Sequence, residues 1–305
     1  MIVRIPIAGS DTMDLTIWPE DAILRALRGQ ITHAPRPLYA SARPAFDIHE
    51  FIPGVLLDDL APRGSAVPPH VIGDVVDLFG RLGAIPAGRV PPQPPDWPAD
   101  GNTTDFARRL SAVTATVHRR FQPEFGGLFA ALGIPDDPLG AIERSWTTLH
   151  PRPFRLLHTD VHRKNLIVND GETYFLDWKL ALWGDPVYDL AVHLHKMAYQ
   201  PDELTALLAG WTETVTGPAA AHWREDLDTY LAHERVKSAI VDTVRYTKLL
   251  TQPGPNPDDH ADLIDKLTAK LAAAHTGGAG WPSRTPPDRA TVIAAIGAWA
   301  ELQPE

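Results

Sequence analysis

The alternation of apolar and polar residues predicts a short mixed segment followed by a long, mainly helical one. Residues 1–7 have the β-branched, partly alternating pattern of a strand. Ile23, Leu24 and Leu27 have the spacing of an apolar stripe on a helix. Residues 37–54 have the pattern of two strands that end at a Pro-Gly pair. This first segment is too small to bury a large core by itself.

Helical periodicity begins at about residue 55. We expect helices over residues 70–84, 104–121, 124–133, 137–148, 186–199, 201–215, 220–251, 258–275 and 287–301. A β-rich island at 155–178 interrupts them. The pattern therefore divides the chain into an αβ lobe (1–54), a helical lobe (55–275), and a linker with a last helix (276–305).

Composition narrows the class of protein. The 305 residues include 44% hydrophobic and 22% charged residues and no Cys, which excludes disulfides and thiolate chemistry. The net charge of −10 argues against a nucleic-acid partner. No apolar run is long enough for a membrane span, and Arg4 interrupts the short apolar N-terminus, which is unlike a signal peptide. We therefore expect a cytoplasmic protein with no membrane partner, either a monomer or a homodimer.

The stretch LLHTDVHRKNLIVNDGETYFLDW, residues 156–178, contains the candidate chemistry. Asp160 and Asn165 precede a hairpin with an Asn-Asp-Gly turn, and Asp177 follows it. Transfer of a nucleotide γ-phosphoryl group needs one carboxylate for the acceptor hydroxyl, and oxygen ligands for Mg²⁺. These three side chains satisfy that need. Asp and Asn also stabilise ordinary turns, but three in this order make that alternative less plausible.

A zinc site is a weaker interpretation of the same stretch. His158 and His162 are four residues apart, but no Glu follows the first His, and the flanking residues favour strand and loop over helix.

The motifs LLHTDVHRKNLIV and YFLDW, followed by LALWGDPVYDLA at 180–191, resemble the aminoglycoside phosphotransferase and choline kinase-like family, distant relatives of protein kinases. The resemblance covers most of the chain and is strongest at 156–191. It implies an α+β, protein-kinase-like two-lobe fold, with a small N-terminal αβ lobe that binds nucleotide and a large, mostly helical C-terminal lobe.

The resemblance also implies roles for individual residues. Asp160 would be the catalytic residue, and Asn165 and Asp177 would be the Mg²⁺ ligands. Asp189 and His158 would brace the catalytic loop.

The N-terminal lobe departs from the family pattern. The family has a Lys, sometimes an Arg, that contacts the phosphates and pairs with a Glu on the next helix. The first Lys here is Lys164, so Arg4 and Glu20 would take these roles. The alternative, a surface strand residue and a first-turn acid, stays equally open. Only three residues precede Arg4, where the family has a nucleotide-covering hairpin. We therefore expect either that the lobe is truncated or that the chain as given starts late, and both alternatives stay open.

The connector HEFIPG, residues 49–54, resembles the family's hinge, and this resemblance implies that the backbone at Glu50 and Ile52 would hold the base of ATP or GTP. Residues 201–275 have an excess of acidic side chains, and Glu234 and Asp242 are the candidates for binding a cationic acceptor. Ordinary solvated helix faces are the alternative.

The leading hypothesis is a Mg²⁺-dependent O-phosphotransferase that uses ATP or GTP and a small-molecule hydroxyl acceptor, such as an antibiotic-inactivating kinase. A metabolic sugar or amino-alcohol kinase, and an inactive kinase-like binding protein, are the alternatives.

Overall fold

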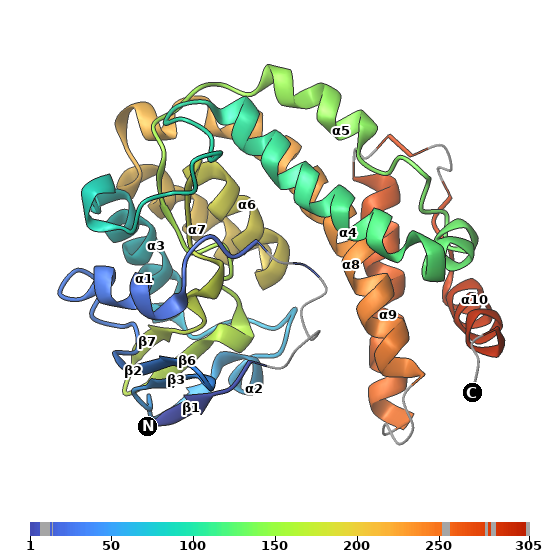
Figure 1. Ribbon diagram of the computed structural model, residues 1–305, viewed down its shortest axis with the longest axis horizontal. Coiled ribbons are helices and arrows are strands. Elements are labelled where there is room, and N and C mark those ends of the chain that lie inside the picture. Colours follow the sequence, from blue (N-terminus) through green and yellow to red (C-terminus); the bar gives the residue numbers. More distant parts are fainter. Residues whose placement is uncertain (7–12, 14, 252–256, 278–279, 282–284, 303–305) are drawn as a thin grey trace. The chain divides into compact units, whose positions relative to one another are not determined.

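The computed structural model describes residues 1–6, 13, 15–251, 257–277, 280–281 and 285–302 (Figure 1). Its contacts divide the chain into two compact units. The first consists mainly of Leu15–Phe106 and His150–Leu227, together with the N-terminal strand. The second consists mainly of Ala107–Leu149 and Asp228–Glu305. The lobe boundaries at residues 54 and 275 stay predictions.

The first unit contains a three-stranded antiparallel sheet with strand order β1-β3-β2. Its strands are β1 (Ile2–Arg4), β2 (Pro37–Ala42) and β3 (Ala45–His49). Helix α1 (Glu20–Leu27) follows β1 and buries Ile23, Leu24 and Leu27, the apolar stripe that the sequence predicts. The predicted order of strand, helix, strand and strand is confirmed.

The β-rich island forms the other sheets of the first unit. Strands β4 (Val55–Leu56), β6 (Leu166–Asn169) and β7 (Glu172–Phe175) make an antiparallel sheet in the order β4-β6-β7, and β5 (Arg155–Leu157) pairs with β8 (Leu182–Gly184). The β6–β7 turn has φ values of 50° at Asp170 and 80° at Gly171, which both lie in the left-handed region that a tight hairpin requires. The predicted hairpin is confirmed.

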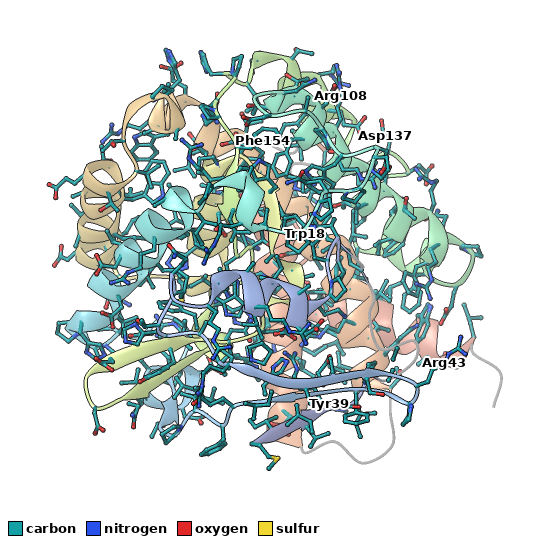
Figure 2. The ribbon with its side chains drawn as sticks, turned by 60° about the vertical axis from the view of Figure 1, so that its left-hand side comes forward. Trp18, Tyr39, Arg43, Arg108, Asp137 and Phe154 are labelled. Atoms are coloured by element: carbon teal, nitrogen blue, oxygen red, sulfur yellow. The ribbon has the colours of Figure 1, made fainter. Side chains whose placement is uncertain are left out.

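Helices pack around these strands. They are α2 (Leu57–Leu60), α3 (Pro69–Ala84), α6 (Pro186–Met197) and α7 (Pro201–Thr214), with 3-10 turns η1 (Ala87–Arg89), η3 (Arg163–Asn165), η4 (Trp178–Leu180) and η5 (Gly217–Ala220). The first turn of α6 is capped by Asp185, which accepts a hydrogen bond from the Val187 N–H, and Pro186 occupies its first position. Figure 2 shows Trp18 and Phe154, which are buried in this unit, and Tyr39, which is exposed.

The second unit is helical in its described residues. It contains most of α4 (Thr103–Ala131) and α8 (Trp223–Leu250), with α5 (Gly140–Ser145), η2 (Trp146–Thr148), α9 (Pro257–Thr276) and α10 (Arg289–Glu301). The Trp299 ring of α10 stacks on Phe125 of α4, with centroids 4.7 Å apart. Trp146 donates to the Ser111 hydroxyl at 2.9 Å. None of the helices in the described ranges has the length and apolar character needed to cross a membrane.

Helix α4 corrects one prediction. The sequence predicts two helices separated at Pro123, whereas the structure has one helix that contains this proline. Pro123 removes one backbone hydrogen bond. Phe121, Phe125 and Phe129 are buried on both sides of it, so packing holds the helix together across the missing bond.

Candidate active site

The loop between β5 and β6 carries the predicted catalytic residue and is braced from α6. The Asp189 carboxylate accepts hydrogen bonds from the backbone N–H groups of His158, at 2.9 Å, and Thr159, at 2.8 Å. Thr159 has a φ of 59°, and its hydroxyl donates to the carbonyl of Leu180 at 2.7 Å. These bonds fix the backbone immediately before Asp160. The bracing expected of Asp189 is therefore present.

His158 is part of this support. It is fully buried against Trp178, with ring centroids 4.2 Å apart. Burial lowers the pKa of His158 to about 4, and burial raises the pKa of Asp189 to about 6. The backbone N–H of Asp160 donates to Nδ1 of His158 at 3.3 Å. A neutral ring that already accepts a backbone bond suits a bracing role better than that of a base.

The Asp160 carboxylate has partners on both oxygens. Asn165 Nδ2 donates to Oδ2 at 2.8 Å and to the backbone carbonyl of Asp160 at 3.0 Å. Lys196 forms an ion pair with Oδ1, and His162 Nε2 lies 3.5 Å from the same atom. Burial is the largest single influence on Asp160 and opposes its ionisation, but the charges and hydrogen bonds of Lys196 and His162 together outweigh burial and hold the pKa of this carboxyl well below its usual value. Asp160 is therefore ionised at neutral pH.

A second cluster of charged side chains lies at the start of η4. Arg4 reaches across from β1, and its guanidinium contacts Glu20 at 2.5 Å and Asp177 at 3.0 Å. Glu20 also accepts a bond from the backbone N–H of Trp178, at 2.9 Å. Burial raises the pKa of Glu20 in spite of Arg4. The structure thus forms the predicted Arg4–Glu20 pair and joins it to Asp177.

Asp177 has an uncommon backbone conformation. Its φ of 59° and ψ of 67° are left-handed, a region that Asp and Asn enter more readily than most side chains. The turn directs the chain from β7 into η4, and the carboxylate stays about one-third exposed.

At the predicted hinge, a backbone group expected to hold a base already has a partner within the protein. Glu50 binds Arg36 through its carboxylate, at 2.9 and 3.0 Å, and its N–H donates to the Arg36 carbonyl. That N–H would have to leave its present partner to contact a base. Ile52 is buried. The role of these two residues stays a prediction.

The two acceptor candidates lie on α8 in the second unit. Glu234 is buried and pairs with Lys237, and Asp242 is nearly buried and pairs with Lys270 at 2.6 Å. A cationic acceptor would have to compete with these lysines. Their part in acceptor binding stays a prediction.

Sequence reasoning missed Lys196. This residue lies in the last turn of α6, seven positions after Asp189, so both side chains lie on one face of the helix. The spacing between Asp189 and Lys196 was the sequence signal from which the role of Lys196 could have been predicted. It also missed Arg163, whose buried guanidinium donates to the carbonyl oxygens of Ser65, at 2.8 Å, and Met197, at 3.0 Å. Arg163 fixes the loop to neighbouring backbone.

A cavity of about 240 Å³ lies elsewhere in the first unit and is lined by residues that include Phe79, Trp211 and Thr214. Its lining does not include Asp160, Asn165 or Asp177, so it gives no support to a substrate site at these residues.

The family follows from a match to most of the chain. A model described as "Phosphotransferase enzyme family" matches residues 1–225, about three-quarters of the chain. The chain belongs to this family. The prediction of a phosphotransferase enzyme is confirmed, and so is the α+β, kinase-like fold. No curated protein sequence matches the chain.

Solved structures resemble this phosphotransferase in fold. Choline kinase LicA from Streptococcus pneumoniae has a TM-score of 0.53 at 10% identity, covering 89% of this chain and 85% of that one. A thermostable mutant of aminoglycoside phosphotransferase APH(4)-Ia, in a ternary complex with AMP-PNP and hygromycin B, has a TM-score of 0.53 at 17% identity, covering 86% and 85%. The GDP complex of aminoglycoside 2'-phosphotransferase-IIIa has a TM-score of 0.52 at 15% identity, covering 82% and 80%.

Proposed function

We propose that this phosphotransferase moves the γ-phosphoryl group of ATP or GTP to a hydroxyl group of a small molecule, with Mg²⁺. The observation that carries the proposal is the contact between Asp160 and Asn165, together with an Arg4 guanidinium that joins Glu20 to Asp177. The two groups are linked because the N–H of Leu176, the residue before Asp177, donates to the backbone carbonyl of Asn165 at 2.8 Å. One carboxylate, two further oxygen ligands and one fixed cation are the parts that phosphoryl transfer uses. All of them belong to the first unit.

Asp160 acts on the acceptor in this proposal. Its ionised carboxylate accepts the proton of the hydroxyl group as the oxygen attacks phosphorus. Asn165 fixes Oδ2, and the Lys196 ammonium fixes Oδ1. Lys196 would also bring positive charge to the place where the phosphoryl oxygens accumulate negative charge.

The donor atoms fit Mg²⁺. Asn165 uses its amide nitrogen on Asp160, which leaves its amide oxygen as the atom able to ligate a cation. Asp177 offers a partly exposed carboxylate. Mg²⁺ prefers carboxylate and amide oxygens, and when bound it would neutralise charge on the nucleotide phosphates. Arg4 would serve the phosphates as well, with Glu20 holding it in place.

The acceptor belongs to a broad class. Two structural neighbours are described as a choline kinase and as an aminoglycoside phosphotransferase in complex with hygromycin B. An acceptor panel should therefore contain amino sugars, amino alcohols and neutral sugars. Turnover with amino-sugar antibiotics would support an antibiotic-inactivating kinase, and turnover with neutral sugars or amino alcohols would support a metabolic one. The proposed reaction suits a cytoplasmic enzyme, since ATP and GTP are plentiful there.

Nucleotide binding is the first test. Dissociation constants for ATP and GTP, measured with and without Mg²⁺, should show tighter binding with the metal. No binding at millimolar nucleotide would contradict the proposal. Mg²⁺-dependent binding without turnover of any acceptor would favour a kinase-like binding protein.

Asp160→Ala tests the chemistry. We expect turnover to fall by at least about 10³-fold, while the circular dichroism spectrum stays unchanged. Asp170→Asn is the matched control, because it neutralises an acid in the same segment at a turn position that Asn tolerates. Activity in Asp160→Ala equal to that of the control would remove Asp160 from the mechanism.

A further inference from the structure

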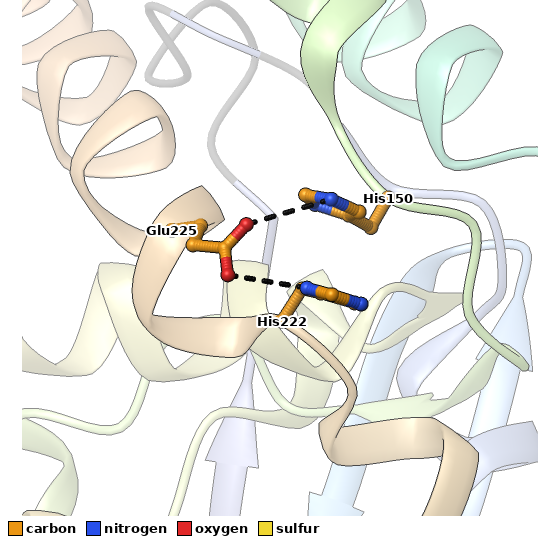
Figure 3. A group of neighbouring side chains, drawn as sticks. All are labelled: His150, His222 and Glu225. Atoms are coloured by element: carbon orange, nitrogen blue, oxygen red, sulfur yellow. Dashed lines mark hydrogen bonds and ion pairs between the residues drawn. The ribbon is translucent and has the colours of Figure 1, made fainter.

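Outside the proposed catalytic region, His150, His222 and Glu225 converge on one point of the first unit (Figure 3). His150 comes from the segment before β5, His222 immediately precedes α8, and Glu225 lies in the first turn of α8. The Glu225 carboxylate lies beside the two rings and bridges them: one oxygen is 3.5 Å from His150 Nε2, and the other is 3.1 Å from His222 Nδ1. Candidate ligand atoms of the three side chains lie within 4.8 Å of one another.

The His150 ring is oriented from its other side. Asp226 accepts a hydrogen bond from the His150 backbone N–H at 3.0 Å and another from Nδ1 at 3.1 Å. Asp226 is itself buried and paired with the buried Arg152, which also binds Asp185 at 2.6 Å. A carboxylate that receives the Nδ1 proton fixes the tautomer and leaves the lone pair on Nε2. Histidines that bind metals are commonly held in this way.

The Nε2 lone pair of His150 then faces another hydrogen-bond acceptor. In the neutral ring, Nε2 is an acceptor that points at a Glu225 oxygen, which is also an acceptor. A cation bound between these two atoms would be attractive to both of them. The His150 and His222 rings are stacked, with centroids 4.0 Å apart and planes 9° apart.

We propose that His150, His222 and Glu225 bind a divalent transition-metal ion of the Zn²⁺ type. Two imidazole nitrogens and a carboxylate oxygen are donors that suit Zn²⁺, whereas Mg²⁺ prefers oxygen ligands alone. A fourth position would be open to water, because His222 and Glu225 are exposed. The site is distinct from Asp160, Asn165 and Asp177, and it does not depend on the proposed phosphoryl transfer.

Binding requires one movement. A metal ion lies in the plane of each imidazole that binds it, and the two parallel planes do not meet. His150 is held by Asp226, whereas the His222 side chain is 53% exposed. The His222 ring therefore turns out of the stack so that its nitrogen points at the ion. Because α8 begins directly after His222, the ion would tie the start of this helix to the segment before β5.

Zinc titration tests the site. The full chain, without an affinity tag and after removal of metals by a chelator, is titrated with Zn²⁺ in a calorimeter, and its melting temperature is recorded with and without Zn²⁺. We expect one Zn²⁺ per chain and a higher melting temperature, since an ion that binds only the folded state stabilises it. Co²⁺ should give the visible absorption of a low-coordinate site, a readout that does not depend on enzymatic activity.

Two variants remove ligands and a third is the control. His222→Asn keeps a side chain that tolerates the left-handed φ of 54° at this position, and Glu225→Gln keeps the shape of an exposed side chain. Each should weaken Zn²⁺ binding by at least about tenfold. His33→Gln is the control, because it alters another His–Glu pair, in which His33 Nε2 lies 3.5 Å from a Glu172 carboxylate oxygen. This variant should bind Zn²⁺ like the parent.

Two results would overturn the proposal. One is the absence of Zn²⁺ binding at millimolar concentration. The other is binding that His222→Asn and Glu225→Gln leave unchanged, which would place the ion elsewhere.

Discussion

At the scale of single residues, Asp160 is set by two opposite influences. Burial favours its neutral form, whereas the Lys196 ammonium and His162 favour its ionised form and together prevail. A buried carboxylate without such partners would take up a proton much more readily. The charge of the proposed base therefore depends in part on a lysine from a different element, α6.

Replacing Lys196 tests this dependence. In Lys196→Met, the nearby positive charge that favours the ionised form of Asp160 is lost, so we expect kcat to fall by about 100-fold. Lys196→Arg keeps the charge and should recover part of the rate. Lys164→Met, which alters an exposed lysine 3.9 Å from Asp58, is the control and should change kcat little. Equal rates for Lys196→Met and the parent would show that Lys196 has no part in turnover.

His193 makes stability depend on pH. Burial lowers its pKa to about 4, and its ring donates to the Val161 carbonyl at 2.9 Å and accepts from the Tyr199 hydroxyl at 3.0 Å. The unfolded chain takes up a proton near pH 6.5, whereas the folded one stays neutral down to about pH 4. The stability that His193 gives is therefore complete above pH 6.5 and is lost as the pH falls toward 4.

The slope of stability with pH is the measurement. Urea unfolding of the parent between pH 6.5 and 4.5 should include a loss of up to about 1.4 kcal/mol per pH unit from His193. His193→Gln cannot titrate, so its curve should be flatter by that amount, even though the variant is less stable at pH 7. Buried Asp189, whose pKa is raised, acts with the opposite sign in both proteins and cancels in the comparison. Parallel curves would contradict the prediction.

At the scale of elements, sequence patterns predicted those features that depend on neighbouring residues. The hairpin at Asp170-Gly171 and the apolar stripe of α1 follow from local rules. Spacing also indicated that Asp160 and Asn165 would meet, because a single short loop joins them. The continuity of α4 across Pro123 could not be predicted in this way, since tertiary burial overrides a local preference there.

The variant Pro123→Ala measures how much the proline lowers the stability of the protein. The proline is exposed, and alanine would restore the missing N–H and remove the ring's clash with the preceding turn. We expect the free energy of unfolding to increase by about 1–3 kcal/mol, measured by chemical denaturation. Glu124→Ala, one residue further along the same exposed face, serves as the control and should differ little from the parent. A loss of stability in Pro123→Ala would mean that the proline is accommodated without strain.

At the scale of the whole molecule, both proposed sites are formed by residues that are far apart in the sequence. Arg4 and Asp177 come from opposite parts of the first unit's sequence, and so do His150 and His222. A resemblance to a family indicated that Arg4 would pair with Glu20 and that Asp177 would bind Mg²⁺, but it did not indicate the contact between Arg4 and Asp177. No local pattern indicated the second pair, since its members are separated by the strands and helices between β5 and α8.

The two units should respond differently to nucleotide. Every residue proposed for nucleotide and Mg²⁺ lies in the first unit, whereas α9 and α10 lie in the second. Hydrogen exchange with Mg²⁺ and ATP should therefore slow in the catalytic loop and η4, because binding stabilises the segments that it contacts. Exchange in α10 should change much less. Equal protection in α10 and the catalytic loop would place nucleotide contacts outside the first unit.

The left-handed backbone at Asp177 has a consequence for engineering. Glycine adopts this conformation without steric cost, so Asp177→Gly relieves strain while it removes a proposed Mg²⁺ ligand. A directed-evolution screen that selects heat resistance alone would enrich that change and collect robust but inactive enzymes. Thermostable versions of this enzyme should be sought with position 177 held fixed, or with a selection that demands turnover in every round.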